Sequence, residues 1–188
     1  MNGRDLRILL LGACGFGIAV AIGIGIVAAA GAYDVAADAR QSTVFGHFIA
    51  WVRERSVDVR ASAVDVPALN RPEMISDGAS DYDEMCTGCH LAPGMPENEM
   101  RPGLDPKPPL LASGAPGDAK IQFWIIKHGI GMTAMPAWGR THSDKEIWNI
   151  VAFLQNLPRL SPHAYRALVA RGGDHHHHET GDGDHMKM

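Results

Sequence analysis

The chain has 188 residues, a formal net charge of −4 and a hydrophobic fraction of 46%, which suits one small domain with an additional membrane element. Because acidic and basic residues nearly balance, a nucleic acid is not expected as a partner.

The N-terminal part of the chain is an uncharged apolar segment of twenty-six residues, from Ile8 to Tyr33. It exceeds the ~20 residues with which a helix crosses the hydrocarbon core, so we expect residues 1–33 to be a transmembrane signal-anchor. Two arginines precede the segment and two aspartates follow it, which by the positive-inside rule keeps the N-terminus in the cytoplasm. We therefore expect a single pass through the cytoplasmic (inner) membrane, with the remaining residues on the periplasmic side.

Two other interpretations of this segment remain open. Residues 30–32 resemble the cleavage site of a signal peptide, although its apolar core would then exceed the usual ~7–15 residues. Residues 11–14 resemble a lipoprotein cleavage box, although cleavage there would leave a long apolar stretch downstream of Cys14. If neither cleavage occurs, Cys14 is expected to be a small buried apolar residue.

Residues 34–72 are predicted to form a juxtamembrane helix, up to about residue 63, and a linker. Val44, Phe48 and Trp51 recur at helical spacing, and several arginines supply a polar side. This pattern indicates a helix on the lipid interface or against a partner subunit; a stalk helix with a solvated charged face fits equally well. Two prolines then interrupt the chain.

The most informative motif is Cys86-Thr87-Gly88-Cys89-His90. Two thiols separated by two residues and followed by a histidine are the attachment pattern of c-type haem, in which each thiol adds to a porphyrin vinyl group and the imidazole binds the iron. A zinc site would need a second ligand pair, and a thioredoxin-like motif would need a βαβ context; neither is present in the sequence. We therefore predict one covalent haem c on Cys86 and Cys89, with His90 as proximal ligand.

The domain around this motif is expected to span residues 73–160. A short helix over 79–85 would deliver the first cysteine. The loop over 91–117 contains seven prolines, and since a loop this long is normally functional, we expect it to wrap on the porphyrin.

Two further helices are predicted in this domain. The first runs from 117 to 127, with one stripe made of Ile121, Trp124, Ile125 and His128. The second opens with a capping box at 143–146 and stops at Pro158. Its apolar positions are Ile147, Trp148, Val151 and Leu154.

A second axial ligand of the haem iron is expected in the segment between these two helices. Haem iron used in electron transfer is commonly held by His and Met. Met135 is favoured because Pro136 follows it and stiffens the turn that aims the sulfur. Met132 is the rival, Met100 is a weaker candidate in a charged setting, and any of them could instead be core filler.

These motifs together resemble the class I cytochrome c family, over residues 73–160. Longer strings at 53–56, 90–94 and 127–130 resemble bacterial membrane-anchored monohaem cytochromes c. The resemblance implies a small all-α domain with terminal helices crossing beside the haem, and a role in respiratory electron transfer. The domain has only four lysines, so docking through a strong lysine ring is not expected.

The C-terminal extension, residues 161–188, ends in a tail rich in histidine. His175, His176, His177, His178 and His185 stand among acidic residues and methionines, a ligand set that suits copper, nickel or zinc. Because the tail is rich in glycine and charge and has no apolar periodicity, we expect it to be disordered without metal. An expression tag or a neutral polar tail would also explain it.

The sequence thus predicts an electron-transfer protein rather than an enzyme: a membrane-anchored monohaem cytochrome with unidentified redox proteins as donor and acceptor. Two alternatives remain. The chain could be a fixed haem subunit of a larger oxidase or dehydrogenase complex, or a copper- or zinc-handling protein that uses its tail.

Overall fold

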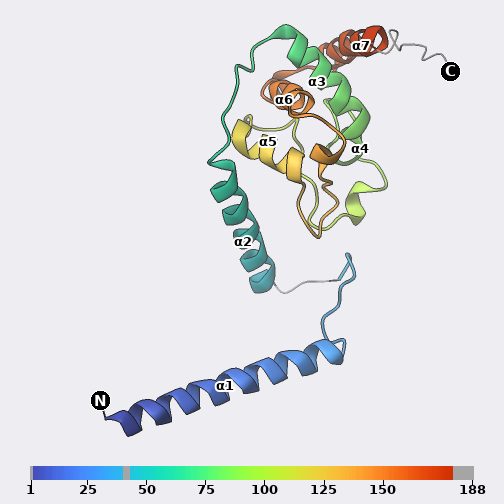
Figure 1. The fold of residues 1–188 in the computed structure, drawn as a ribbon. Helices are drawn as coiled ribbons and strands as arrows, with labels where there is room; N and C mark the ends of the chain where they lie inside the picture. Colours follow the sequence, from blue (N-terminus) through green and yellow to red (C-terminus); the bar gives the residue numbers. More distant parts are fainter. Residues whose placement is uncertain (1, 40–42, 180–188) are drawn as a thin grey trace, which may run out of the picture. The chain divides into compact units, whose positions relative to one another are not determined.

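The computed structural model describes residues 2–39 and 43–179, and these residues form helices and loops without a β-strand (Figure 1). The all-α class expected from the sequence is therefore confirmed. The chain divides into two compact units, residues 1–40 and 41–188, which are described separately below.

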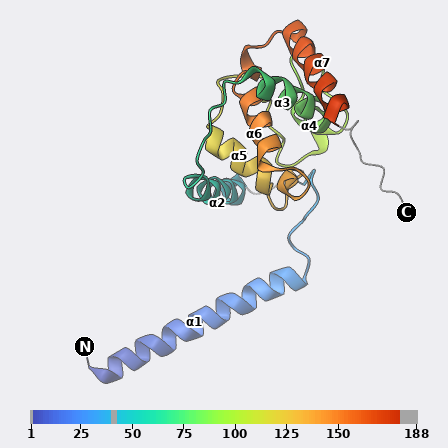
Figure 2. The same cartoon turned by 45° about the horizontal axis from the view of Figure 1, so that its top comes forward.

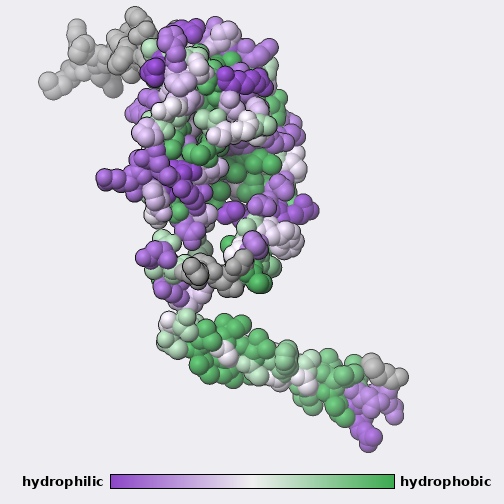
Figure 3. Space-filling view, turned by 180° about the vertical axis from the view of Figure 1, so that it is seen from behind, coloured by the Kyte–Doolittle hydropathy of each residue, from purple (hydrophilic) through white to green (hydrophobic). Residues whose placement is uncertain are grey.

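The first unit is one long helix, α1 (Gly3–Ala29), closed at its N-terminus by a capping box. At its other end Gly31 adopts a φ of 61°, and the amides of Gly31 and Ala32 donate to carbonyls of the last turn, which is a Schellman motif. No residue of α1 is buried, and Cys14 is exposed on it. On the face seen in Figure 3, mostly hydrophobic residues line this helix except near its N-terminal end.

The second unit begins with α2 (Thr43–Ala61). The helix expected from residue 34 is thus shorter than predicted, because residues 30–39 form turns and bends after the Schellman motif. Val57 and Ala61 are buried where α2 packs against α5 (Ala119–His128), while Val44, Phe48 and Trp51 are exposed.

The helix that leads to the cysteine motif is α3 (Pro72–Met85). The sequence placed its start at residue 79, but the helix begins seven residues earlier, with Pro72 at its first position, where a missing amide hydrogen has no cost. Gly78 lies in its middle because the backbone of α6 (Asp144–Leu154) passes too close for a side chain there. Tertiary packing therefore overrides the weak helix propensity of glycine.

The two predicted helices of the domain are α5 and α6. The Asp118 carboxylate caps α5, and the expected capping box of Ser143 and Glu146 opens α6. The stripe predicted for α5 is wrong in part: Phe123 and Ile126 are its buried residues, and His128 is exposed. This helix contacts both α2 and α6, so its burial does not follow one narrow face.

The core of the second unit lies where α3 packs against both α6 and α7 (Pro162–Glu179), as both ribbon views show (Figures 1 and 2). Tyr82, Phe153 and Tyr165 form its aromatic centre, with ring centroids 5.3 and 6.1 Å apart along this series. The Tyr165 hydroxyl donates to Asp83 at 2.6 Å. Packing in this unit therefore continues beyond residue 160, the end of the domain expected from the sequence.

The first part of the histidine-rich tail differs from the expectation of disorder, because the backbone of α7 is helical to Glu179. This helix is held to α3 at its Gly172, whose backbone lies against Ser76. Residues 180–188, which include His185, lie outside the described residues.

Candidate functional site

The cysteine motif lies at the junction of two helices. Cys86 follows the last residue of α3, and α4 (Thr87–His90) comes directly after it. The amide of His90 donates to the Cys86 carbonyl at 2.8 Å, so one helical turn carries both thiols and the imidazole. Burial, reinforced by the Asp81 carboxylate, raises the pKa of the Cys86 thiol to about 12.

The motif borders a cavity of about 430 Å³. Its walls are mostly apolar and come from the end of α3 with the cysteine motif, from α5 and from two loops, with one residue each from α2 and α6. The lining residues are Arg53, Met85, Cys86, Cys89, His90, Pro106, Lys107, Pro108, Pro109, Leu111, Gln122, Ile125, Ile126, Ile130, Thr133, Ala134, Met135, Pro136, Trp138 and Leu154. The proline-rich loop thus lines the cavity, as expected of a segment that wraps on a bound group.

The imidazole of His90 is oriented by the proline-rich loop. Its Nδ1 lies 2.9 Å from the carbonyl oxygen of Pro109. Because a carbonyl oxygen only accepts, Nδ1 carries the proton and Nε2 is left with a free electron pair for a metal. Burial lowers the pKa of His90 and the nearby Arg101 adds to this effect, against the opposing influence of the Pro109 hydrogen bond. A neutral imidazole is the form that binds a metal.

The Pro109 carbonyl belongs to a loop that is braced by charged groups. Arg101, only 6% exposed, donates to the carbonyl of Pro108 at 2.6 Å and pairs with Glu97 at 2.8 Å. Glu97 also pairs with Lys107 at 2.6 Å, and these hydrogen bonds lower the pKa of its carboxyl group. We call Glu97, Arg101 and Lys107 the loop clamp.

The backbone after His90 is held as well. Leu91 has a φ of 59°, which is uncommon for a residue with a side chain, and it is buried. The hydroxyl of Tyr82 donates to its carbonyl oxygen at 2.7 Å. Because burial raises the pKa of Tyr82, the hydroxyl remains protonated and keeps this bond.

The methionines considered from the sequence occupy different surroundings. Met135 lines the cavity, and its backbone is held by hydrogen bonds to Thr133 and Ile130, both 3.1 Å long. Met132 is fully exposed with a φ of 61°, and Met100 is 50% exposed; neither lines the cavity. Met85 lines it too, from the last turn of α3, and is the one further thioether among the described residues that line this cavity.

The loop that carries Met135 depends on Gly129, at the end of α5. Its φ is 67°, and a Cβ there would collide with the backbone of Met135 and Ala137. Only glycine therefore allows this loop to fold back against the helix end and present Met135 to the cavity.

The chemistry of these donors fits a haem. Two adjacent thiols, an imidazole with an unprotonated nitrogen and a thioether all border one apolar space. An apolar wall suits a porphyrin ring, and the soft donors suit haem iron. The sequence missed Arg53, which reaches the same cavity from α2; no local pattern could have indicated it, because the contact joins residues far apart in the chain.

The tail histidines were the second metal-binding group predicted from the sequence. His175, His176, His177 and His178 belong to α7 by their backbone, and His185 lies outside the described part of the chain. Among residues 2–39 and 43–179, no group of three or more His, Cys, Asp or Glu side chains is arranged to hold a metal ion. Metal binding by the tail stays a prediction.

Comparison with known proteins adds one match. Residues 73–154 match the family model described as cytochrome C oxidase, cbb3-type, subunit III. Neither a search of curated proteins nor a search of solved structures finds a match to the chain. The matched segment contains the cysteine motif, Met135 and α6, so it covers most of the cavity wall. The chain therefore contains a c-type cytochrome domain, and it is a haem c electron-transfer protein.

Proposed function

We propose that the protein is a membrane-anchored monohaem cytochrome c that carries single electrons in a bacterial respiratory chain. Cys86 and Cys89 would hold the haem through thioethers, and His90 and Met135 would supply the two protein ligands of its iron. The observation that supports this most is the apolar cavity that all four side chains border. When bound, haem c supplies one iron that changes between the ferrous and ferric states.

The residues of the chain determine how that group would be held. The Pro109 carbonyl fixes the ring of His90, and the Gly129 turn presents Met135. A thioether ligand favours the ferrous state and so raises the potential. If His90 and Met135 both bind the iron, no position would be left on it for a substrate, which supports electron transfer rather than catalysis.

The N-terminal helix supports anchoring. α1 has 27 residues, which at about 1.5 Å per residue is longer than the ~30 Å hydrocarbon core. An 18-residue stretch of this helix has a mean hydropathy of 2.4, and none of that stretch is buried within the protein. The arginines at the N-terminal end of this helix favour a cytoplasmic N-terminus. The helix would then cross the inner membrane once, with the haem domain on the periplasmic side.

The test of haem attachment uses the three cysteines. Cys86→Ala and Cys89→Ala should each leave haem on at most one thioether, which shifts the absorption of the pyridine haemochrome, while Cys14→Ala should keep the wild-type spectrum. In the wild-type protein, acid-acetone extraction should leave the haem on the polypeptide. Complete release of haem from the wild type would refute the attachment.

A second candidate is a fixed haem subunit of a larger oxidase complex. It is favoured by the description of the matching family, which names an oxidase subunit, although the match covers residues 73–154 only. Extraction in mild detergent followed by size-exclusion chromatography separates the two candidates. A shuttle should elute alone, whereas a fixed subunit should elute with other redox proteins.

A further inference from the structure

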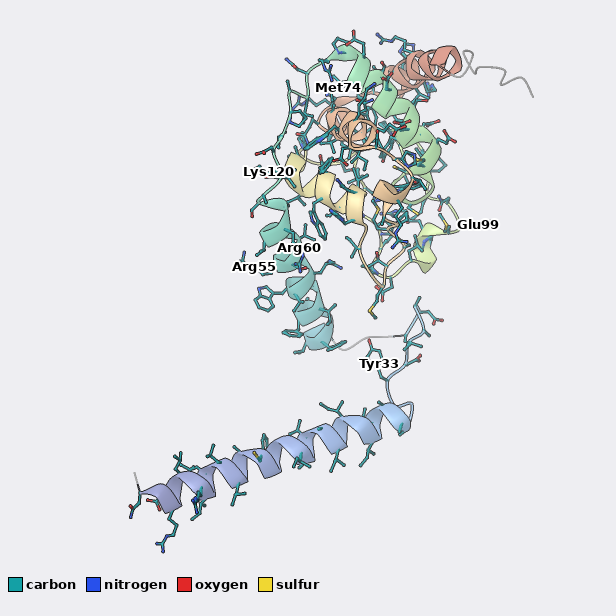
Figure 4. The ribbon with its side chains drawn as sticks, viewed as in Figure 1. Tyr33, Arg55, Arg60, Met74, Glu99 and Lys120 are labelled. Atoms are coloured by element: carbon teal, nitrogen blue, oxygen red, sulfur yellow. The ribbon has the colours of Figure 1, made fainter. Side chains whose placement is uncertain are left out.

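Arg53 lines the cavity although it lies outside the cytochrome domain matched by the family model. It belongs to α2, the first helix of the second unit. Its side chain is 32% exposed, whereas Arg55, two residues on, is exposed on the side of α2 away from α5 (Figure 4). These two arginines of one helix therefore have different surroundings.

The position of Arg53 follows from how α2 packs. Val57 and Ala61 are 6% and 1% exposed against α5, and the ammonium group of Lys120 lies 3.5 Å from the Ser62 carbonyl. Arg53 precedes Val57 by four residues and so shares its face of the helix. The cavity wall includes Arg53 together with Ile125 and Ile126, which lie near the C-terminal end of the same helix α5.

The charges around the cavity leave Arg53 with unused hydrogen-bonding capacity. No carboxylate of the described residues lines the cavity, and its two long-chain cations are Arg53 and Lys107. Lys107 is paired with Glu97 at 2.6 Å. Arg53 has an ion pair with Glu54 at 3.8 Å, and the Glu54 side chain is 69% exposed, so this pair contributes little. A guanidinium has five N–H donors.

We propose that Arg53 binds a carboxylate of the bound haem, so that α2 completes the haem site from outside the cytochrome domain. This rests on the proposed haem attachment. The propionates are the only charged side groups of a porphyrin, and in a largely apolar cavity they need a cationic partner. A guanidinium matches a carboxylate in two parallel hydrogen bonds, which a point charge cannot do.

The expected effect of Arg53 on the iron is electrostatic. A positive charge near the haem disfavours the ferric form, which has one more positive charge than the ferrous form. Removal of Arg53 should therefore lower the midpoint potential. The haem carboxylate would also lose its cationic partner, and its uncompensated negative charge favours the ferric form and lowers the potential further. The segment that follows the membrane helix would thus help to set the potential.

The test compares Arg53→Ala, Arg53→Lys and Arg55→Ala in the full-length protein in mild detergent. Each variant is first extracted with acid-acetone; haem that stays on all of them shows that the attachment holds independently of this proposal. Potentiometric titration should then show a clear downward shift for Arg53→Ala, a smaller one for Arg53→Lys, and a potential close to wild type for Arg55→Ala.

A second measurement follows the carboxylate itself. Redox-induced infrared difference spectra, with the haem carboxylates labelled with carbon-13, should show a displaced carboxylate band in Arg53→Ala and an unchanged band in Arg55→Ala. Equal shifts of potential in the two alanine variants, or a carboxylate band that Arg53→Ala leaves in place, would overturn the proposal.

Discussion

At the scale of single residues, the imidazole proposed to bind the iron is oriented by other groups of the protein. His90 donates to Pro109, and Arg101 holds the neighbouring carbonyl of Pro108. The clamp is made of charged hydrogen bonds, which are stronger than neutral ones, and Arg101 is nearly buried. The orientation of His90 thus depends on residues of the proline-rich loop up to nineteen positions away.

The choice of methionine is testable at this scale. Met135→Ala should abolish the weak long-wavelength charge-transfer band of the oxidised protein that marks a sulfur ligand, and should lower the midpoint potential. Met132→Ala is the matched control and should keep both, since Met132 is fully exposed. Absorption spectroscopy measures the band, and potentiometry measures the midpoint potential.

The remaining thioether of the cavity provides the counter-test. If the sulfur band persists in Met135→Ala and disappears in Met85→Ala, then Met85 is the ligand. If it disappears only in Met132→Ala, the loop must rearrange when haem binds.

The loop clamp predicts a pH-dependent stability. The lowered pKa of Glu97 means that its ionised form stabilises the folded state above its ordinary value of 4.5, and that this contribution is lost as pH falls through the lowered folded-state value. Glu97→Gln should therefore lower the melting temperature at pH 7 and have progressively less effect in acid. Thermal unfolding of the haem-loaded protein at several pH values measures this.

Glu99→Gln is the control, because it removes the same charge from an exposed position two residues away, labelled in Figure 4. An equal loss of stability in both variants would show that net charge, and not the clamp, is responsible.

At the scale of elements, the second unit is organised by close helix crossings. α3 meets α6 at Gly78 and α7 meets α3 at Gly172, and at both places the facing backbone leaves no room for a Cβ. The small residues let the helices approach until Tyr82, Ile147 and Ile150 are wholly or almost wholly buried between them. The cavity depends on this packing, because α3 delivers Cys86.

Substitution at the crossing predicts a large and specific effect. Gly78→Ala should destabilise the protein by about 3 kcal/mol or more, since a backbone collision cannot be relieved by a side-chain rotation. Gly46→Ala, in α2 with nothing within 4 Å of the added Cβ, should be neutral or stabilising by up to about 1 kcal/mol. Chemical unfolding gives both values, and a mild Gly78→Ala would contradict the crossing geometry.

At the scale of the whole molecule, the protein combines an apolar helix with a haem domain. We expect α1 to be retained, so the full-length protein should remain in the membrane fraction after carbonate washing, and its N-terminus should be intact. Removal of residues 1–33, with an unrelated cleavable signal in their place, should release a soluble haem protein with an unchanged spectrum.

N-terminal sequencing decides between retention and cleavage. A mature chain that begins near Asp34 in the soluble periplasmic fraction would contradict retention while leaving export intact. A chain that begins at a modified Cys14 would instead show lipidation.

Some features could be predicted from the sequence because they depend on residues close together in the chain. The thiols and imidazole of the Cys86–His90 segment need one helical turn, and the capping box of α6 needs four residues. The long apolar run of α1 needs no partner within the protein. The all-α class and the c-type cytochrome domain followed from such local signals.

Other features were decided only by the tertiary structure, because they join parts of the chain that are distant in sequence. The helix α3 begins at Pro72 rather than 79 because α6 and α7 stabilise it across its glycine. Met132 and Met135 lie three residues apart in one loop, and the sequence preferred Met135 only for the proline after it; the folded loop places Met135 at the cavity and leaves Met132 exposed to solvent. Arg53 reaches the same cavity only because α2 packs on α5. The free energy that stabilises this packing comes from burial of side chains between the two helices, and no local sequence pattern encodes which helices will meet.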